Sequence, residues 1–459
     1  MLGFSPGALT LSPSGLCEKQ DAAAQGGAPT RLGTLAVMAV TTKTVGETCE
    51  AAQRAARVLG GASTETKNAA LEATARLLEE RSADILEANA GDLAGERAES
   101  LTRALRDRLA LSGDRVAAMA EGVRVVAALD DPVGEELERK RLESGLDLRK
   151  MRVPLGVVAV VYEARPNVTI DCAALTIKSG NAIVLRGSSY AERSNGALAA
   201  VVRDALEEVG LPPDVVLLLP AGEGRGDLAE LATQEGTVDL LIPRGGEGLK
   251  AALKGVASVP VMYAAAGNCH VYVHSEADLE MARRIAYNAK VQRPGVCNAA
   301  ETLLVDAAIA ADFLPRALAE LHGAGVELVG DERARGLAGE VEVGAATDAD
   351  WSTEYLDLKM VVGVVDSLDE AIDHVNGHGT SHSEAIVTGS EEAAARFAAE
   401  VDAAVVYTNA STRFTDGFEF GMGAEIGNST QKLHARGPIG LRELTTYKYV
   451  VRGDGQVRE

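Results

Sequence analysis

The sequence is poor in aromatic residues and in positive charge. Only 3% of its 459 residues are aromatic, and 45 lysines and arginines stand against 67 aspartates and glutamates, for a formal net charge of −22 at pH 7. Nucleic acid and anionic membrane surfaces repel such a chain, so we expect neither as a partner. An anionic substrate must then be bound by a local group of cations and not by the field of the whole protein.

Paired cysteines and metal motifs are also missing. The cysteines are an odd number without any C-x-x-C pair: Cys17, Cys49, Cys172, Cys269 and Cys297. We therefore expect no disulfide framework and no structural zinc. Three histidines, at positions 374, 378 and 382, recur every four residues. Glycines at 377 and 379 are predicted to break a helix there, so we expect a polar loop that lines a cleft and no metal site.

Long hydrophobic runs and a leader sequence are absent as well. The longest apolar segment, around residues 157–162, is too short to span a bilayer, and we expect no membrane partner and a cytoplasmic location. Residues 1–37 lack the basic and hydrophobic regions of a secretory signal. We interpret them as a disordered extension or as the product of an upstream start codon, with Met38 as the better start.

What the sequence does contain is an alternation of strand and helix patterns. Apolar runs typical of buried parallel strands lie at residues 157–162, 182–185, 215–219 and 238–242. Helical patterns separate them, which predicts an α/β fold with a doubly wound sheet. A second α/β unit follows, with strands near residues 302–305, 326–329, 360–365 and 384–387.

Four parts of the chain follow from these patterns. They are a disordered extension (1–37), a cofactor-binding domain (38–268), a catalytic domain (269–435) and a C-terminal return segment with an oligomerisation strand (436–459). Charged, extended residues at about 138–152 predict a hairpin that projects from the first domain. Because an exposed strand edge has to be paired or protected, we expect this hairpin to contact a partner subunit in a homo-oligomer.

Three polar turns follow strands of the first sheet, at residues 163–167, 186–189 and 243–246. In a doubly wound sheet ligands bind at the carboxyl ends of the strands. Glycine, serine and arginine in such turns favour bound phosphate, and they also occur in ordinary connecting turns. The candidates for cofactor binding are Arg186, Gly187, Ser188, Pro243, Arg244, Gly245 and Gly246. No G-x-G-x-x-G follows the first strand, so this pattern alone does not identify the cofactor.

Cys297 follows Pro294 and Gly295, in a predicted loop between a helix at residues 279–291 and the strand at 302–305. A thiol at such a junction can face a cleft and act as a nucleophile. The alternative for an isolated cysteine is an inert, buried side chain.

Several segments together resemble the aldehyde dehydrogenase superfamily and, within it, the glutamate-5-semialdehyde dehydrogenase (gamma-glutamyl-phosphate reductase) family. The segments that carry this resemblance are residues 162–169, 178–187, 267–272, 293–301 and 427–441, and the similarity runs from about residue 40 to the end. The resemblance implies NADPH-dependent reduction of L-glutamyl 5-phosphate to L-glutamate 5-semialdehyde and phosphate through a cysteine thioester, in proline biosynthesis. It also implies functional coupling to glutamate 5-kinase.

The resemblance assigns roles to individual residues. Cys297 matches the family nucleophile and Asn167 the amide of the oxyanion hole. Arg186 matches the position that holds the adenosine ribose, with Lys178 as a further cofactor residue, and Glu354 matches loosely the glutamate that binds the nicotinamide ribose. The substrate is expected to contact Arg436 at its α-carboxylate, Arg165 at its phosphate, and Lys432 and His378 nearby, with Ser381 and His382 as further lining residues.

One departure from the wider superfamily bears on the reaction. Residues 264–268 occupy the stretch in which hydrolytic aldehyde dehydrogenases carry a general-base glutamate, and they contain no carboxylate. A thioester on Cys297 should then persist until it is reduced. Three alternatives stay open: an NAD(P)-dependent aldehyde dehydrogenase that forms a free acid, a cysteine acyltransferase or amidase, and a non-catalytic binding protein.

Overall fold

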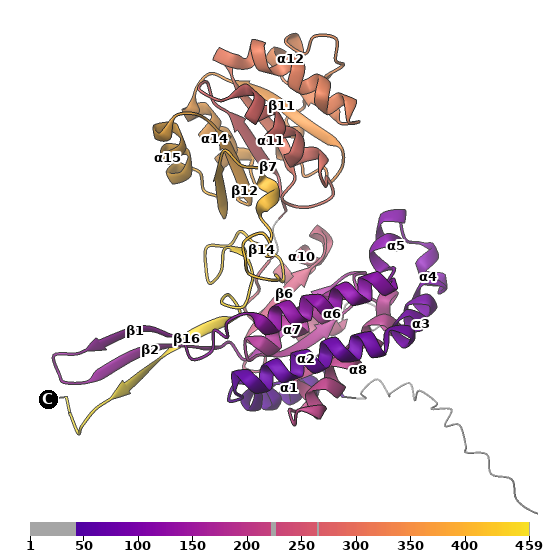
Figure 1. Ribbon diagram of the computed structural model, residues 1–459, viewed down its shortest axis with the longest axis vertical. Helices are drawn as coiled ribbons and strands as arrows, with labels where there is room; N and C mark the ends of the chain where they lie inside the picture. The colour runs from indigo at the N-terminus through magenta and orange to yellow at the C-terminus, as the bar shows by residue number, and fades with distance from the viewer. Residues whose placement is uncertain (1–42, 222–225, 264–265, 459) are drawn as a thin grey trace, which may run out of the picture. The chain divides into compact units, whose positions relative to one another are not determined.

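The computed structural model describes residues 43–221, 226–263 and 266–458 (Figure 1). The predicted disordered extension, residues 1–37, lies outside this part of the chain. The described chain opens with helices, and Thr44 starts the first of them with a capping box that it shares with Glu47. These helices are α1 (Val45–Leu59), α2 (Thr64–Glu80), α3 (Ser82–Leu93), α4 (Glu96–Glu99), α5 (Arg103–Leu109) and α6 (Gly113–Ala128).

A four-stranded parallel sheet follows in the order β5-β4-β3-β6. Its strands are β3 (Val157–Tyr162), β4 (Ala182–Arg186), β5 (Val216–Leu218) and β6 (Leu240–Arg244), and its helices are α7 (Asn167–Lys178), α8 (Glu192–Glu208), α9 (Gly226–Leu231) and α10 (Glu247–Lys254). Every residue of β3 is buried. Val158 and Val160 face a core with α2, α6, α7 and α8, while Val157, Ala159 and Val161 face α1. This arrangement confirms the predicted α/β fold class.

The second sheet has seven parallel strands in the order β10-β9-β11-β8-β7-β12-β13. The strands are β7 (Cys269–Val273), β8 (Ala300–Asp306), β9 (Glu327–Gly330), β10 (Gly344–Ala345), β11 (Lys359–Val365), β12 (Ser383–Val387) and β13 (Val405–Thr408). The helices are α11 (Leu279–Val291), α12 (Ala307–Gly323), α13 (Glu332–Gly336), α14 (Leu368–His378) and α15 (Glu391–Glu400). The predicted strands at 326–329, 360–365 and 384–387 are confirmed within one residue or so.

Charged and polar side chains are buried in this second sheet. Lys290 of α11 and Glu301 of β8 form an ion pair at 2.5 Å with no exposed surface on either side chain. Glu384 of β12 accepts hydrogen bonds from the backbone N–H of His270 in β7 at 2.6 Å, and its Oε2 lies 3.0 Å from the Nδ1 of the same histidine. The first pair joins α11 to β8, and the second joins β12 to β7.

The helix break predicted at Gly377 and Gly379 is wrong at Gly377 and confirmed at Gly379. Helix α14 continues through Gly377 and ends at His378, with Gly379 as its C-cap. A glycine inside a helix costs only about 1 kcal/mol relative to alanine, so packing of the apolar face overrides it. His374 and His378 consequently lie on one helix face with ring centroids 4.6 Å apart. Within the described residues no cluster of three histidine, cysteine or acidic side chains could hold a metal ion.

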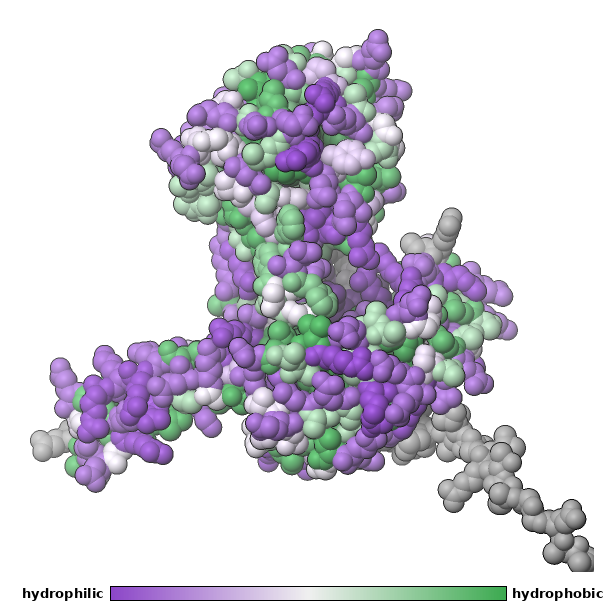
Figure 2. Space-filling model, in the orientation of Figure 1, coloured by the Kyte–Doolittle hydropathy of each residue, from purple (hydrophilic) through white to green (hydrophobic). Residues whose placement is uncertain are grey.

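The projecting hairpin consists of β1 (Glu136–Arg141) and β2 (Asp147–Pro154). The free edge of β2 is paired along its length with β16 (Thr445–Arg452) of the same chain, which makes a three-stranded antiparallel arm. Aromatic and aliphatic side chains on β16 remain exposed, among them Tyr447, Tyr449 and Val451. Figure 2 shows hydrophobic atoms scattered among hydrophilic ones over this arm.

The remaining elements are short. They are the paired strands β14 (Asn428–Ser429) and β15 (Gly437–Pro438), and the 3-10 helices η1 (Ser189–Ala191), η2 (Pro213–Val215), η3 (Asp350–Ser352) and η4 (Thr412–Phe414). Of the helices in the described part of the chain, none combines the length and the apolar character that crossing a membrane requires.

Candidate active site

Cys297 lies in the loop that joins α11 to β8, where the turn residues before it predict a loop. Its side chain is half-buried, and its backbone carbonyl accepts a hydrogen bond from the thiol of Cys269 at 3.2 Å. The backbone of Gly267 passes so close to this carbonyl that a Cβ at position 267 would overlap it. The segment that leads into β7 therefore supports the loop directly.

Asn298 binds the same loop to a distant part of the chain. Its side chain is 5% exposed and donates a hydrogen bond to the carbonyl of Thr415 at 2.9 Å. Its own carbonyl accepts a hydrogen bond from the hydroxyl of Thr412 at 2.7 Å. A loop fixed in this way holds the neighbouring thiol in one position, as an attacking nucleophile requires.

The surroundings of Cys297 act on the pKa of its thiol in opposite directions. Burial raises this pKa, the guanidinium of Arg244 lowers it, and the carboxylates of Glu425 and Glu354 raise it, with a result of about 11. At neutral pH the side chain is therefore mainly a thiol. The positive charge of Arg244 favours the thiolate that attacks a carbonyl group.

The charges of four arginines from separate segments change one another's pKa values or that of this thiol. We call these four residues the arginine cluster: Arg165, Arg244, Arg293 and Arg413. Desolvation lowers the pKa of Arg165 to about 10, and repulsion from Arg108, Arg244 and Arg293 contributes. Desolvation and the charge of Arg293 likewise lower the pKa of Arg413. The charge of Cys297 opposes both shifts. Because guanidinium groups gathered in this way repel one another, the cluster favours an anion that carries more than one charge.

Asn167 is the first residue of α7, at the carboxyl end of β3. Its amide donates a hydrogen bond to the carboxylate of Asp171 at 2.9 Å, one helical turn further on. A side-chain amide has two N–H donors, so one remains for another acceptor. The geometry is therefore compatible with the predicted oxyanion role, which stays a prediction.

The carboxyl ends of β4, β3 and β6 lie side by side and carry the predicted cofactor turns. Gly187 packs so tightly against Asn195 that a Cβ would displace its amide, and Ser188 caps the short helix η1. Pro243 and Arg244 end β6, and Gly245 and Gly246 lead into the N-terminus of α10. A helix N-terminus at such an edge favours phosphate, so these residues fit a dinucleotide.

Arg186, predicted to lie beside the adenosine ribose, forms a bidentate ion pair. Its Nε and Nη2 donate to the carboxylate of Asp227 at 2.9 and 3.2 Å. Both side chains are largely buried. A phosphate on the ribose would have to share the Arg186 guanidinium with the Asp227 carboxylate. Ribose hydroxyls, in contrast, could donate hydrogen bonds to that carboxylate.

The position of Lys178 contradicts its predicted role in cofactor binding. It ends α7, at the opposite end of that helix from the cofactor turns, and its side chain has no exposed surface. Its ammonium group donates to the side chain of Asn68 at 2.6 Å and to the carbonyl of Ala127 at 2.7 Å. It therefore joins α7 to α2 and to the end of α6, because a buried ammonium must be hydrogen-bonded.

Glu354 lies next to the nucleophile loop. Its Oε1 accepts a hydrogen bond from the backbone N–H of Gly267 at 2.7 Å, and its charge raises the pKa of Cys297. This position is compatible with the predicted contact to the nicotinamide ribose, because the hydride must reach a carbon bound to Cys297.

Two of the residues predicted to bind substrate are engaged elsewhere. Lys432 and Arg436 share the carboxylate of Asp402, at 2.6 and 2.8 Å. The Nε of Arg436 is buried without an acceptor among the described residues. Arg165 differs from these two residues in that the charge of Cys297 acts on it. The substrate contacts of all three stay predictions.

Of the histidine and serine candidates, His378 ends α14, and Ser381 and His382 lie between α14 and β12. The ring of His378 contacts Ser352 through Nδ1 at 3.1 Å, and its carbonyl accepts a hydrogen bond from Asn268. His382 is buried, with its Nδ1 2.8 Å from the hydroxyl of Ser383. Ser381 adopts a left-handed backbone conformation with φ of 58° just before this buried pair.

Sequence reasoning missed several charged residues near the thiol. Arg293 stands in the same motif as Cys297, and that adjacency could have identified it. Arg413 and Glu425 come from the C-terminal third of the chain, where no local pattern marks them. Arg244 was predicted as a cofactor residue, and its charge acts on the nucleophile.

Comparisons with known proteins agree with this geometry. Residues 29–355 match the model of the aldehyde dehydrogenase family. The chain is 52% identical over 414 residues to a gamma-glutamyl phosphate reductase of Thermobifida fusca, covering 90% of this chain and 98% of that protein. A relative of the same name from Koribacter versatilis is 53% identical over 415 residues, with 90% and 100% covered. The crystal structure of a gamma-glutamyl phosphate reductase from Thermotoga maritima superimposes with a TM-score of 0.88 at 46% identity, covering 91% of this chain and all of that one.

The fold and the cysteine loop thus define a member of the aldehyde dehydrogenase superfamily, whose members use nicotinamide cofactors. Within that superfamily the chain belongs to the gamma-glutamyl phosphate reductase family, and it is an oxidoreductase.

Proposed function

We propose that this enzyme reduces L-glutamyl 5-phosphate to L-glutamate 5-semialdehyde and phosphate, with NADPH as the reductant and a thioester on Cys297 as the intermediate. The observation that carries the proposal is the arginine cluster around the thiol, in a chain whose net charge is −22. An acyl phosphate brings its dianionic leaving group next to the carbon that the thiolate attacks. A local group of cations can hold that phosphate, while the protein as a whole repels anions.

In the first step the Cys297 thiolate attacks the acyl carbon, forming a C–S bond as the C–O bond to phosphate breaks. Arg244 favours the thiolate, and Arg165, with the rest of the cluster, holds the departing phosphate. The free N–H of Asn167 stabilises the oxyanion; one such donor typically contributes about 3 kcal/mol. Phosphate leaves as a stable anion, so this step needs no strong general acid.

In the second step the thioester is reduced and the product leaves. When bound, NADPH would supply the hydride that reduces the carbonyl carbon of the thioester. The resulting hemithioacetal collapses, which breaks the C–S bond, releases the aldehyde and regenerates the thiolate. The turns at Arg186–Ser188 and Pro243–Gly246, together with Glu354, are the residues that we assign to holding the dinucleotide.

The competing proposal is an aldehyde dehydrogenase that forms a free acid. It requires a base that activates water next to the thioester. Glu425 supports this alternative. Burial raises the pKa of Glu425 to about 7, which is a suitable value for a general base. The charge of Glu425 also acts on Cys297. Residues 266–268, which adjoin the nucleophile, supply no carboxylate of their own.

One assay separates these proposals. L-glutamate 5-semialdehyde is oxidised with NADP or NAD, in the presence and in the absence of phosphate, and the product is trapped with hydroxylamine. The reductase proposal predicts turnover that depends on phosphate and a product that forms a hydroxamate. Equal turnover without phosphate, with free glutamate as the product, supports the competing dehydrogenase.

The arm formed by β1, β2 and β16 supports our proposal of a homo-oligomer, since exposed side chains such as Tyr447, Tyr449 and Val451 are suited to an interface. We also propose a cytoplasmic location, which a biosynthetic role implies. We further propose that the labile substrate is received from glutamate 5-kinase. Removal of residues 445–452 should lower the molecular mass measured by sedimentation. Transfer from the kinase should resist an added scavenger of free acyl phosphate.

A further inference from the structure

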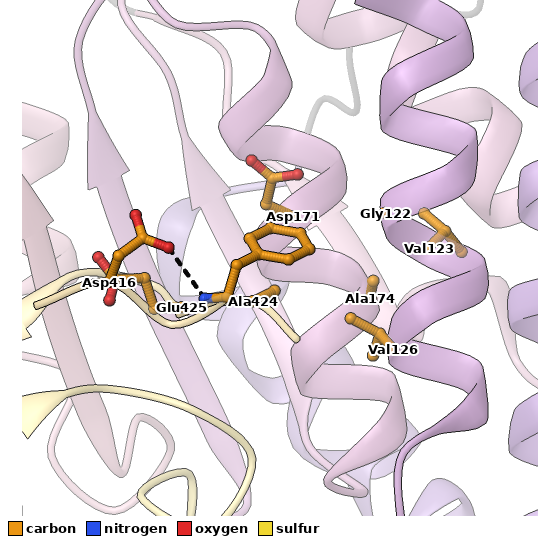
Figure 3. A pocket seen from close by; sticks show the side chains of 9 residues that line it. Gly122, Val123, Val126, Asp171, Ala174, Asp416, Ala424 and Glu425 are labelled. Atoms are coloured by element: carbon orange, nitrogen blue, oxygen red, sulfur yellow. Dashed lines mark hydrogen bonds between the residues drawn. The ribbon is translucent and has the colours of Figure 1, made fainter. Parts of the chain in front are cut away.

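A cavity of about 170 Å³ lies between α6, α7 and the loop that precedes β14. Its wall on the helix side is apolar and includes Val123, Val126 and Ala174. Figure 3 shows three carboxylates that also line it: Asp171 from α7, the helix that carries Ala174, and Asp416 and Glu425 from the C-terminal loop. A water molecule occupies about 30 Å³ of liquid, so the cavity has room for a small polar group with its immediate neighbours.

Two of the carboxylates at this cavity have donors: Asp171 accepts a hydrogen bond from the amide of Asn167 at 2.9 Å, and Asp416 accepts one from the backbone N–H of Phe418 at 2.9 Å. The third carboxylate, Glu425, has an oxygen without one. Glu425 accepts one hydrogen bond through Oε1, from the amide of Asn428 at 3.0 Å, and its buried Oε2 accepts none from the described residues. Asn428 is only 5% exposed, and its Oδ1 is also buried without a donor among those residues. Of these two buried acceptors, only the Oε2 of Glu425 belongs to a residue that lines the cavity, and an N–H donor of a ligand there would satisfy it.

The carboxylates at the cavity favour the binding of a cation. Burial raises the pKa of Asp171 to about 6 and that of Glu425 to about 7, and Asp416 adds to the effect on Glu425. Arg244 is the charge that lowers both values. A further positive charge held between the carboxylates would relieve the cost of burying them.

A charge that lines the cavity acts on the nucleophile. Arg244 acts on Cys297, on Asp171 and on Glu425, and Glu425 itself acts on Cys297. The arginine cluster and the acidic cavity thus offer binding regions of opposite charge, and residues of both act on the thiol. A substrate that carries both an anionic phosphate and a cationic group near its other end would fit the two regions.

We propose that the acidic cavity formed by Asp171, Asp416 and Glu425 binds the α-ammonium group of the amino-acid substrate. This inference rests on the function proposed above, in which the substrate is an α-amino acid phosphorylated on its side-chain carboxylate. The ammonium group donates its N–H groups to Glu425 and the neighbouring acceptors. Its position fixes the carbon chain, so the acyl carbon faces Cys297. The cavity therefore selects amino acids over acids that lack the amino group.

The test compares two substrates in the oxidative direction, with phosphate and NADP present. They are L-glutamate 5-semialdehyde and 5-oxopentanoate, which has the same carbon chain without the amino group. The wild-type enzyme is expected to prefer the first by about 100-fold or more in kcat/KM, because the second leaves buried acceptors unpaired. In Glu425→Gln and Asp416→Asn this preference should fall to about tenfold or less, mainly through a higher KM for the amino substrate.

A matched control is Glu419→Gln, which removes an exposed carboxylate from the same loop and should leave the preference unchanged. A second measurement needs no variant. Norvaline and pentanoate, tested as inhibitors of the wild-type enzyme, differ only in the amino group, and norvaline should inhibit at least about tenfold better.

The outcomes are distinct. If the wild-type enzyme does not oxidise the semialdehyde in a phosphate-dependent way, the proposed function fails and this inference fails with it. If it does, and both variants keep the wild-type preference or pentanoate inhibits as well as norvaline, only the ammonium site is overturned. An equal loss of kcat for both substrates in Glu425→Gln also overturns it, because Glu425 would then act in the chemical step.

Discussion

The two parallel sheets of this enzyme have the same kind of connections and different interiors. Strand β3 of the four-stranded sheet is fully buried and consists of Val, Ala and Tyr alone. In the seven-stranded sheet, β7, β8 and β12 bury His270, Glu301 and Glu384. The first sheet is held by apolar packing and offers backbone turns at its edge. The second buries polar pairs beneath the loop that carries the thiol, so its stability depends on partners and on pH.

The largest effect should come from removing the thiol. Cys297→Ala is expected to lower kcat by about 1,000-fold or more, since no other group can form the thioester. Binding of NADPH, measured by fluorescence titration, should stay unchanged because the residues assigned to the dinucleotide turns lie on the other sheet. Substantial turnover by this variant would contradict the assignment of Cys297.

Breaking the buried ion pair should have the next largest effect. Lys290→Met leaves the carboxylate of Glu301 buried without its partner, which typically costs about 3–5 kcal/mol. The matched change in the four-stranded sheet, Ile183→Val, should cost about 0.5–1.5 kcal/mol. Urea unfolding measures both.

The double variant Lys290→Met/Glu301→Leu serves as the control, because it leaves no unpaired charge. It should recover most of the stability that Lys290→Met loses. If Lys290→Met and Ile183→Val cost the same, the two interiors do not differ in the way described above.

A smaller difference should appear on acidification. Burial lowers the pKa of His374 to about 3, with help from His270 and His378, and lowers that of His382 to about 4. The unfolded chain binds protons on these histidines below about pH 6.5, while the folded chain binds them only near pH 3–4. Their contribution to stability is therefore complete above pH ~6.5 and is lost as the pH falls, by about 1 kcal/mol per pH unit for each histidine.

Hydrogen exchange at pH 7 and pH 5 locates this loss. Burial also raises the pKa of Glu301 to about 7, so protonation of this carboxylate opposes the loss between pH 7 and pH 5. The loss is therefore measured beside a histidine: amides of β12 should lose protection at pH 5 before those of the four-stranded sheet, and His382→Gln should reduce the difference. Equal loss of protection in both sheets would count against a role for the buried histidines.

The smallest effect concerns the edge of the four-stranded sheet. Asp227 occupies the guanidinium of Arg186, so Asp227→Asn should make that cation available to a ribose phosphate and lower the Kd for NADPH by about 5- to 10-fold relative to NADH. Isothermal titration with each cofactor measures the ratio. An unchanged ratio would show that the pair lies away from the ribose.

The contrast between the sheets also explains what the sequence could and could not predict. Residues 157–162 are apolar throughout, and their strand was predicted to the residue as β3. Strand β7 was not recognised as a strand, because Cys269 and His270 interrupt its apolar character. The continuation of α14 through Gly377 was missed for a similar reason, since packing against the sheet outweighs one unfavourable residue.

At the active site, prediction succeeded where one motif held the information. The loop position of Cys297 follows from the residues just before it. Arg413 and Glu425 lie more than a hundred residues further along the chain, and only folding lets their charges and that of Cys297 act on one another. No periodicity or spacing marks such residues, because what selects them is their distance from Cys297 in space. The burial of Lys178 and the ion pair of Arg186 likewise depend on helices that pack from elsewhere.

The completion of the arm has a consequence for biosynthesis. Strand β2 is made early, and its neighbour β16 lies close to the end of the chain. During translation, the edge of β2 that pairs with β16 therefore stays unpaired while almost three hundred further residues (155–444) are synthesised. Long-range pairing of this kind forms slowly, and an open edge invites aggregation. A chain that is released before β16 is made would keep this edge of β2 unpaired. We expect that a chaperone that covers β2 during translation would raise the yield of intact enzyme.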